Sequence, residues 1–153
     1  ASQARFKEAL KVLQTHKTVD PTKIASIGYC FGATVSLRMA RSGENLNGVV
    51  AFHGSLPLEP PMNPGKVKAA VLVINGSEDA FLKSETVASF MKEMYEANVD
   101  LTYINLAGIK HSYTNPRADE FNKKFNIGNL EYNKQADERS WLAMQRFFNR
   151  VFD

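Results

Sequence analysis

A five-residue motif with a glycine at each end constrains the fold of this chain more than any other feature. Cys30 stands at its centre, between Gly28 and Gly32. A strand-like run over residues 23–27 precedes the motif, and a helical pattern from Ala33 follows it. A sharp strand-to-helix turn presses backbone segments together, so both glycines are expected to remove Cβ atoms that would clash. The motif therefore predicts a nucleophile elbow that carries cysteine at the reactive position.

A cysteine at this position would attack as a thiolate, which the positive end of the following helix favours. The backbone N–H of Phe31 is expected to lie in the same corner and to donate to an oxyanion, as one half of an oxyanion hole. The motif alone leaves an alternative open, because a lone cysteine in a globular domain is usually a small buried hydrophobe. The partners of Cys30 must decide between these two interpretations.

Length and composition predict one domain over residues 1–153, since the chain is 44% hydrophobic and long enough to bury a core. One cysteine excludes an internal disulfide and fits a reducing, cytoplasmic location. The net charge of +3 comes from dispersed lysines and arginines, which argues against a nucleic-acid partner. We also expect no membrane association, because no apolar run approaches bilayer length and the first residues lack the features of a signal peptide.

Apolar periodicity predicts strands that alternate with helices. Strands are expected over residues 24–27, 48–54, 69–74 and 101–106, and helices over about 2–16, 34–40 and 84–97 and from about 133 onward. This alternation is typical of an α/β fold, in which a mainly parallel sheet carries helices on both faces. In such a sheet, functional residues collect at the carboxyl ends of the strands.

Two finer expectations concern the third helix and the loops. Ser84 is expected to cap that helix, with Val87, Phe90, Met91 and Met94 facing inward. Residues 107–132 are predicted as one long loop. A second loop is marked by helix-breaking prolines at Pro57, Pro60, Pro61 and Pro64.

Partners for Cys30 follow the later strands. Asp79 leaves the third predicted strand and His111 follows the fourth, so both should lie at the same sheet edge as Cys30. The order nucleophile, acid, histidine is the chain order of α/β-hydrolases. The less specific interpretations are a surface loop histidine at 111 and a turn residue with an Asx hydrogen bond at 79.

Other titratable residues are weaker candidates. Glu78 is the rival acid, but its side chain is longer and it comes one position earlier. His53 also ends a strand, yet it precedes the acid, so we expect a structural or pocket-lining role. His16, near the end of the first predicted helix, is expected only to interact with that helix terminus.

With these residues in place, the chain resembles the dienelactone hydrolase family of α/β-hydrolases. The resemblance is carried by residues 28–32, 52–56, 75–79 and 111–116, together with the closing run 132–148. It extends over nearly the whole chain. It implies that Cys30 is the nucleophile, His111 the base and Asp79 the acid that orients the base.

The resemblance also implies an activity, the hydrolysis of small carboxylic esters or lactones through a thioester on Cys30, with no metal or organic cofactor. The family's arginine four residues after the histidine is replaced here by Asn115, and Arg117 is out of register, which argues against dienelactone itself. An alternative is a hydrolase-like protein that binds a ligand or partner without catalysis. A redox-sensing thiol is disfavoured, because no second cysteine can resolve it.

The number of predicted strands departs from the family. Four strands are fewer than an α/β-hydrolase needs, and those missing precede the elbow, so the resemblance covers only the C-terminal part of the fold. The strand at 24–27 would otherwise be a bare sheet edge. We therefore expect an N-terminal half ahead of Ala1, or a partner chain, to cover that edge.

Overall fold

The computed structural model describes residues 1–60, 62 and 64–153 of the chain. Its strands are β1 (Ala25–Tyr29), β2 (Gly48–Phe52), β3 (Ala70–Gly76) and β4 (Leu101–Leu106). Its helices are α1 (Ser2–Thr15), α2 (Phe31–Arg41), α3 (Ser84–Glu96), α4 (Ala118–Phe125) and α5 (Lys134–Phe152). Each predicted strand is present, with ends displaced by no more than two residues.

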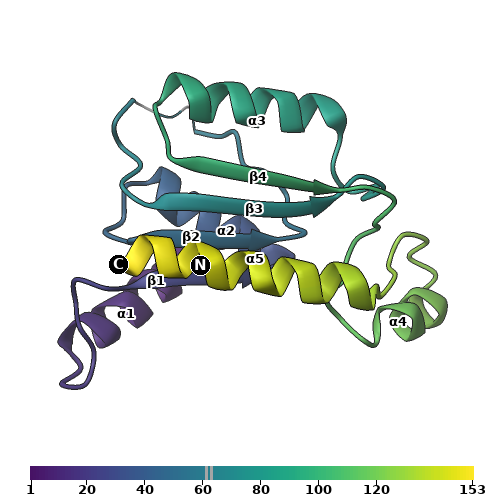
Figure 1. Cartoon of the computed structure of the whole chain (residues 1–153), viewed down its shortest axis with the longest axis horizontal. Coiled ribbons are helices and arrows are strands. Elements are labelled where there is room, and N and C mark those ends of the chain that lie inside the picture. The colour runs from purple at the N-terminus through teal and green to yellow at the C-terminus, as the bar shows by residue number, and fades with distance from the viewer. Residues whose placement is uncertain (61, 63) are drawn as a thin grey trace.

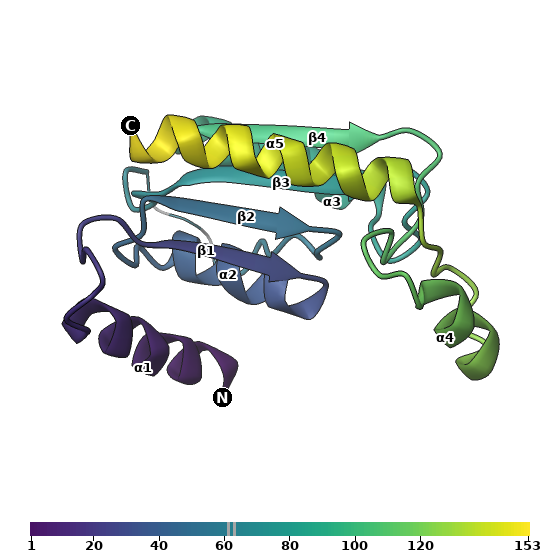
Figure 2. The same cartoon turned by 60° about the horizontal axis from the view of Figure 1, so that its bottom comes forward.

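The four strands form one parallel sheet in the order β1-β2-β3-β4. All of its pairings are parallel, and the strand arrows visible in Figures 1 and 2 point the same way, so the carboxyl ends of the strands share one edge of the sheet. Chain order and spatial order coincide, which places β1 at one border of the sheet and β4 at the other. The predicted α/β class with a parallel sheet is confirmed.

Helices cover both faces of this sheet, because side chains of successive strand residues point to opposite sides. On one face, Val49 and Val71 pack against α2 and α3, in a core that includes Leu37 and Phe90. On the other face, Val50 and the neighbouring strands pack against α5. Figure 2 shows α5 crossing in front of the sheet while α2 and α3 lie behind it.

Three local predictions were wrong. The loop over 107–132 contains the helix α4, which has acidic residues in its first turn and lysines in its last but buries only Ala118. Helix α3 begins after Lys83, and Ser84 is its first helical residue and not its cap. Met91 on the same helix is 43% exposed, whereas Phe90 and Met94 are buried as predicted. Pro61 lies outside the described residues.

Candidate active site

Cys30 sits at the junction of β1 and α2, with φ 51° and ψ −118°. A positive φ is strained for a residue other than glycine, and such strain occurs preferentially at functional sites. The conformation is held from the neighbouring strand, since the Cys30 N–H donates to the carbonyl of Phe52 at 3.0 Å. Helix α2 starts at the next residue, so the thiol stands at the positive end of the helix dipole.

The two glycines of the motif differ in their surroundings. A Cβ on Gly28 would lie under 3.0 Å from backbone atoms of Gly32 and Ala33, so residue 28 must be glycine for this turn to form. A Cβ on Gly32 would meet nothing within 4 Å. The predicted reason for Gly32 was therefore wrong, because the close approach involves its backbone and not the space where its side chain would be. Sequence reasoning also missed Gly54, whose Cβ would lie 2.5 Å from that of Ala33.

Cys30 and its two predicted partners lie together at the carboxyl edge of the sheet. His111 Nε2 is 3.3 Å from Cys30 Sγ, and His111 Nδ1 is 2.7 Å from Asp79 Oδ2. A carboxylate accepts hydrogen bonds and does not donate them, so Nδ1 carries the proton and Nε2 presents its lone pair to the thiol. His111 and Asp79 are both buried, at 8% and 5% exposure. This arrangement can move a proton from sulfur to imidazole.

Each partner is held by its own loop. The second carboxylate oxygen of Asp79 accepts from the N–H of Phe81 at 2.9 Å, which fixes the carboxylate plane. The backbone of His111 forms an isolated bridge with Leu130. The rings of His53 and Phe81 contact the His111 ring edge-on, each with centroids 5.0 Å apart. The imidazole therefore has little freedom to rotate away from the thiol.

His53 is a second buried histidine, 3% exposed, beside the first. Burial, followed by the nearby His111, lowers the pKa of His53 to about 4, so this ring is neutral at neutral pH. Its Nε2 is 2.8 Å from the hydroxyl of Thr114. Its Nδ1 has no partner within the described part of the chain. His53 lines a cavity beside the site, in line with the pocket-lining role expected of it.

The remaining candidates lie as follows. Glu78 is exposed, and the acid that contacts His111 is Asp79. His16 ends α1, where its ring accepts from the N–H of Thr18 at 3.3 Å. Phe31 is the first residue of α2, where backbone N–H groups have no partner within the helix, and its ring is 69% exposed.

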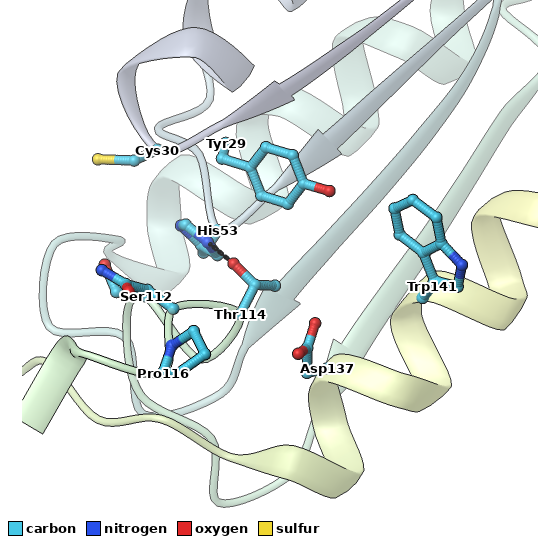
Figure 3. A pocket seen from close by; sticks show the side chains of 9 residues that line it. Tyr29, Cys30, His53, Ser112, Thr114, Pro116, Asp137 and Trp141 are labelled. Atoms are coloured by element: carbon cyan, nitrogen blue, oxygen red, sulfur yellow. Dashed lines mark hydrogen bonds between the residues drawn. The ribbon is translucent and has the colours of Figure 1, made fainter.

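Two cavities flank Cys30, and both include Ser112 in their walls. One of about 490 Å³, here called the apolar cavity, is lined mainly by Phe31, Phe81, Ile127 and Leu130. The other, of about 500 Å³ and here called the polar cavity, is lined by Tyr29, His53, Thr114, Asn115, Asp137 and Trp141 among others. Figure 3 shows the polar cavity from close by.

Among residues 1–60, 62 and 64–153, no group of three or more histidine, cysteine or acidic side chains is placed to hold a metal ion. Within the same residues, the helices are too short or too polar to cross a bilayer.

Comparison with known proteins gives consistent matches. The dienelactone hydrolase-like promiscuous phosphotriesterase P91, from metagenomic libraries, is 34% identical with a TM-score of 0.86, over 98% of this chain and 61% of that one. A solved structure called m3DLH is 35% identical with a TM-score of 0.91, over 99% and 62%. "Protein usf" of Aquifex pyrophilus is 25% identical over 118 residues, 76% of this chain and 51% of that protein.

The matched lengths show how much of the family's fold is present. The chain spans about half the length of the curated relatives it matches. Its sheet and helices also superpose on solved α/β-hydrolases of lower identity, which supports the fold class. The model of the dienelactone hydrolase family matches residues 1–152. The chain belongs to the dienelactone hydrolase family, with the α/β-hydrolase fold.

Proposed function

We propose that this protein hydrolyses small carboxylic esters or lactones with Cys30 as the nucleophile, His111 as the base and Asp79 as the acid that orients it. The observation that supports the proposal is the continuous chain of contacts from the Cys30 thiol through both nitrogens of His111 to the Asp79 carboxylate. A structural cysteine would need none of these contacts. The exposed, strained elbow gives the same side chain access to a ligand.

The proposed reaction has two stages. His111 Nε2 takes the thiol proton, and the thiolate attacks the ester carbonyl, whose oxygen accepts a hydrogen bond from the Phe31 N–H. The carbon–oxygen bond then breaks, and the alcohol leaves with the proton from His111. A water molecule, deprotonated by the same nitrogen, attacks the thioester, which releases the carboxylic acid and returns the proton to the Cys30 sulfur.

The side chains that line the two cavities indicate which class of substrate fits. The apolar cavity, of about 490 Å³, is the right size for a small acyl or aryl group. Within the described residues, neither cavity has lysine or arginine among its lining side chains. An anionic dienelactone would lack a counter-charge there, so a neutral or cationic ester is the better fit. Phosphotriesters are a second candidate class, because P91, at 34% identity, bears that activity in its name.

Hydrolysis of p-nitrophenyl acetate by the protein at its natural full length tests this proposal. Cys30→Ala and His111→Ala should reduce turnover to the uncatalysed background, and Asp79→Asn should lower kcat/KM by at least about a hundredfold. Glu78→Gln is the matched control, since it neutralises the adjacent exposed acid and should leave kcat/KM within about twofold. Turnover that persists in Cys30→Ala would exclude the thioester mechanism.

Alkylation by iodoacetamide separates an enzyme from a protein that only binds a ligand. An activated thiol should react quickly at neutral pH and more slowly in His111→Ala, because the imidazole no longer takes the proton. A protein that is folded, reacts slowly in both forms and shows no turnover would support the non-catalytic alternative.

The exposed edge of the sheet at β1 leads to a second part of the proposal. On β1, Ile27 is 46% and Tyr29 40% exposed, and among the described residues the strand pairs only with β2. We infer that a further strand, from this protein or from a partner chain, pairs with β1 and brings the second oxyanion donor. Hydrogen exchange of the β1 amides that face away from β2 tests this inference, since a bare edge would exchange quickly.

A further inference from the structure

The polar cavity contains a carboxylate without a basic partner. Asp137, in the first turn of α5, points into it, and the described residues offer no lysine or arginine to form an ion pair with this side chain. Burial, followed by the adjacent Glu138, raises the pKa of Asp137, although a hydrogen bond from Tyr132 opposes the shift. The site therefore holds negative charge that is partly desolvated and not neutralised.

Aromatic rings line the same space. Tyr29 is held by a stacked contact with Phe52, whose ring lies 4.6 Å away and nearly parallel. Trp141 follows Asp137 by four residues on α5, so the two side chains share one face of the helix. Figure 3 shows the Asp137 carboxylate and the Trp141 ring, both from α5, facing the Tyr29 side of the cavity.

The other polar side chains that line the polar cavity add no positive charge. His53 is 97% buried and neutral at neutral pH, and its Nδ1 is without a partner among the described residues. Thr114 and Asn115 contribute uncharged polar groups. A carboxylate beside two aromatic rings suits an alkylammonium group, which is attracted both to the ring faces and to the negative charge.

We propose that the polar cavity binds an organic cation, and that the preferred substrates are esters that carry an alkylammonium group on one side of the scissile bond. The inference extends the proposed function by assigning a substrate class to the second cavity. Cys30 borders both cavities, so an ester bound across it can place its neutral part in the apolar cavity and its cationic part beside Asp137.

Binding can be measured without any turnover. Trp141 is the single tryptophan of this chain and lines the cavity, so its fluorescence responds to a ligand bound there. Choline should change the emission in a saturable way, and 3,3-dimethylbutanol, which has the same shape without the charge, should do so at least about tenfold more weakly. Equal responses to the two compounds, or none to choline, would overturn the inference.

Variants of two adjacent acidic residues show which carboxylate binds choline. Asp137→Asn keeps the shape of the side chain and should weaken choline binding about tenfold. Glu138→Gln is the matched control: it removes the same charge one residue further on, from an exposed side chain that faces Lys134, and should change binding by less than about twofold. Similar losses in both variants would contradict a specific site at Asp137. Circular dichroism establishes that each variant is folded.

Rates of hydrolysis of a cationic and a neutral ester test whether the polar cavity contributes to substrate selection. The ratio of kcat/KM for acetylcholine to kcat/KM for 3,3-dimethylbutyl acetate, measured by acid release in a pH-stat, should exceed one in the parent protein. The ratio should fall about tenfold in Asp137→Asn. Choline binding without hydrolysis of either ester would leave the cation site intact and count against the proposed function. Hydrolysis with an unchanged ratio in Asp137→Asn would count against the cation site.

Discussion

The two glycines of the elbow should respond differently to the same added methyl group. In Gly28→Ala, the new Cβ would lie under 3.0 Å from backbone atoms of Gly32 and Ala33, where an ordinary contact is 3.4–4 Å. Backbone atoms cannot swing aside as a side chain does, so β1 and α2 must separate. Overpacking of this kind costs about 1–3 kcal/mol, and here the upper half of that range is expected.

In Gly32→Ala, the new Cβ would meet nothing within 4 Å, and residue 32 lies inside the first turn of α2. Alanine restricts the unfolded chain and favours the helix, so this variant should be more stable than the parent by about 0.5–1 kcal/mol. Urea denaturation monitored by circular dichroism measures both free energies of unfolding. The expected gap between the variants is about 3 kcal/mol, and equal stabilities would refute the assigned contact.

Two further predictions concern buried charge. The pKa of His53 lies at about 4 in the folded protein, below its ordinary 6.5, so the unfolded chain binds more protons between these two pH values. The free energy of unfolding should therefore fall by about 3 kcal/mol as the pH drops through that window. His53→Gln should flatten this part of the plot of urea midpoint against pH. Glu93→Gln should lower the free energy of unfolding, measured by heat or urea, by about 3 kcal/mol, because the side chain of its ion-pair partner Arg41 is only 4% exposed. Glu120→Gln is the control: its partner Arg117 is exposed, and the loss should be less than about 0.5 kcal/mol.

The parts of the fold that sequence reasoning recovered are those set by burial. Strands β2 and β3 are buried along nearly their whole length, and they read as apolar runs because both faces of the sheet are covered. Helix α4 was missed although Ala118, Phe121 and Phe125 recur along it at helical spacing, and only Ala118 of the three is buried. Its charges carried a second signal: Asp119 and Glu120 in the first turn and lysines in the last complement the helix dipole.

Topology predicted that the three candidate residues lie close together, but it did not predict the finer contacts around them. Cys30, Asp79 and His111 each follow a strand of one parallel sheet, which suffices to place them at one edge. The packing of His53 and Phe81 on His111 depends on how the loops fold back over the strands. A sequence pattern contains no information on that packing, because loop residues have neither a helical nor a strand period to reveal which side chain faces inward.

The distance between Asp79 and His111 depends on a glycine outside the motif. A Cβ on Gly76, the last residue of β3, would lie under 3.0 Å from the carbonyl group of Ile109. That same carbonyl accepts from the N–H of Glu78 at 2.9 Å, so the turn after β3 and the loop after β4 are joined directly beside the site. Since Asp79 and His111 lie one and two residues beyond this junction, their 2.7 Å contact follows from the close approach of the two backbones. Asp79 and His111 are thus positioned relative to each other by β3 and β4, and the elbow then brings Cys30 to them.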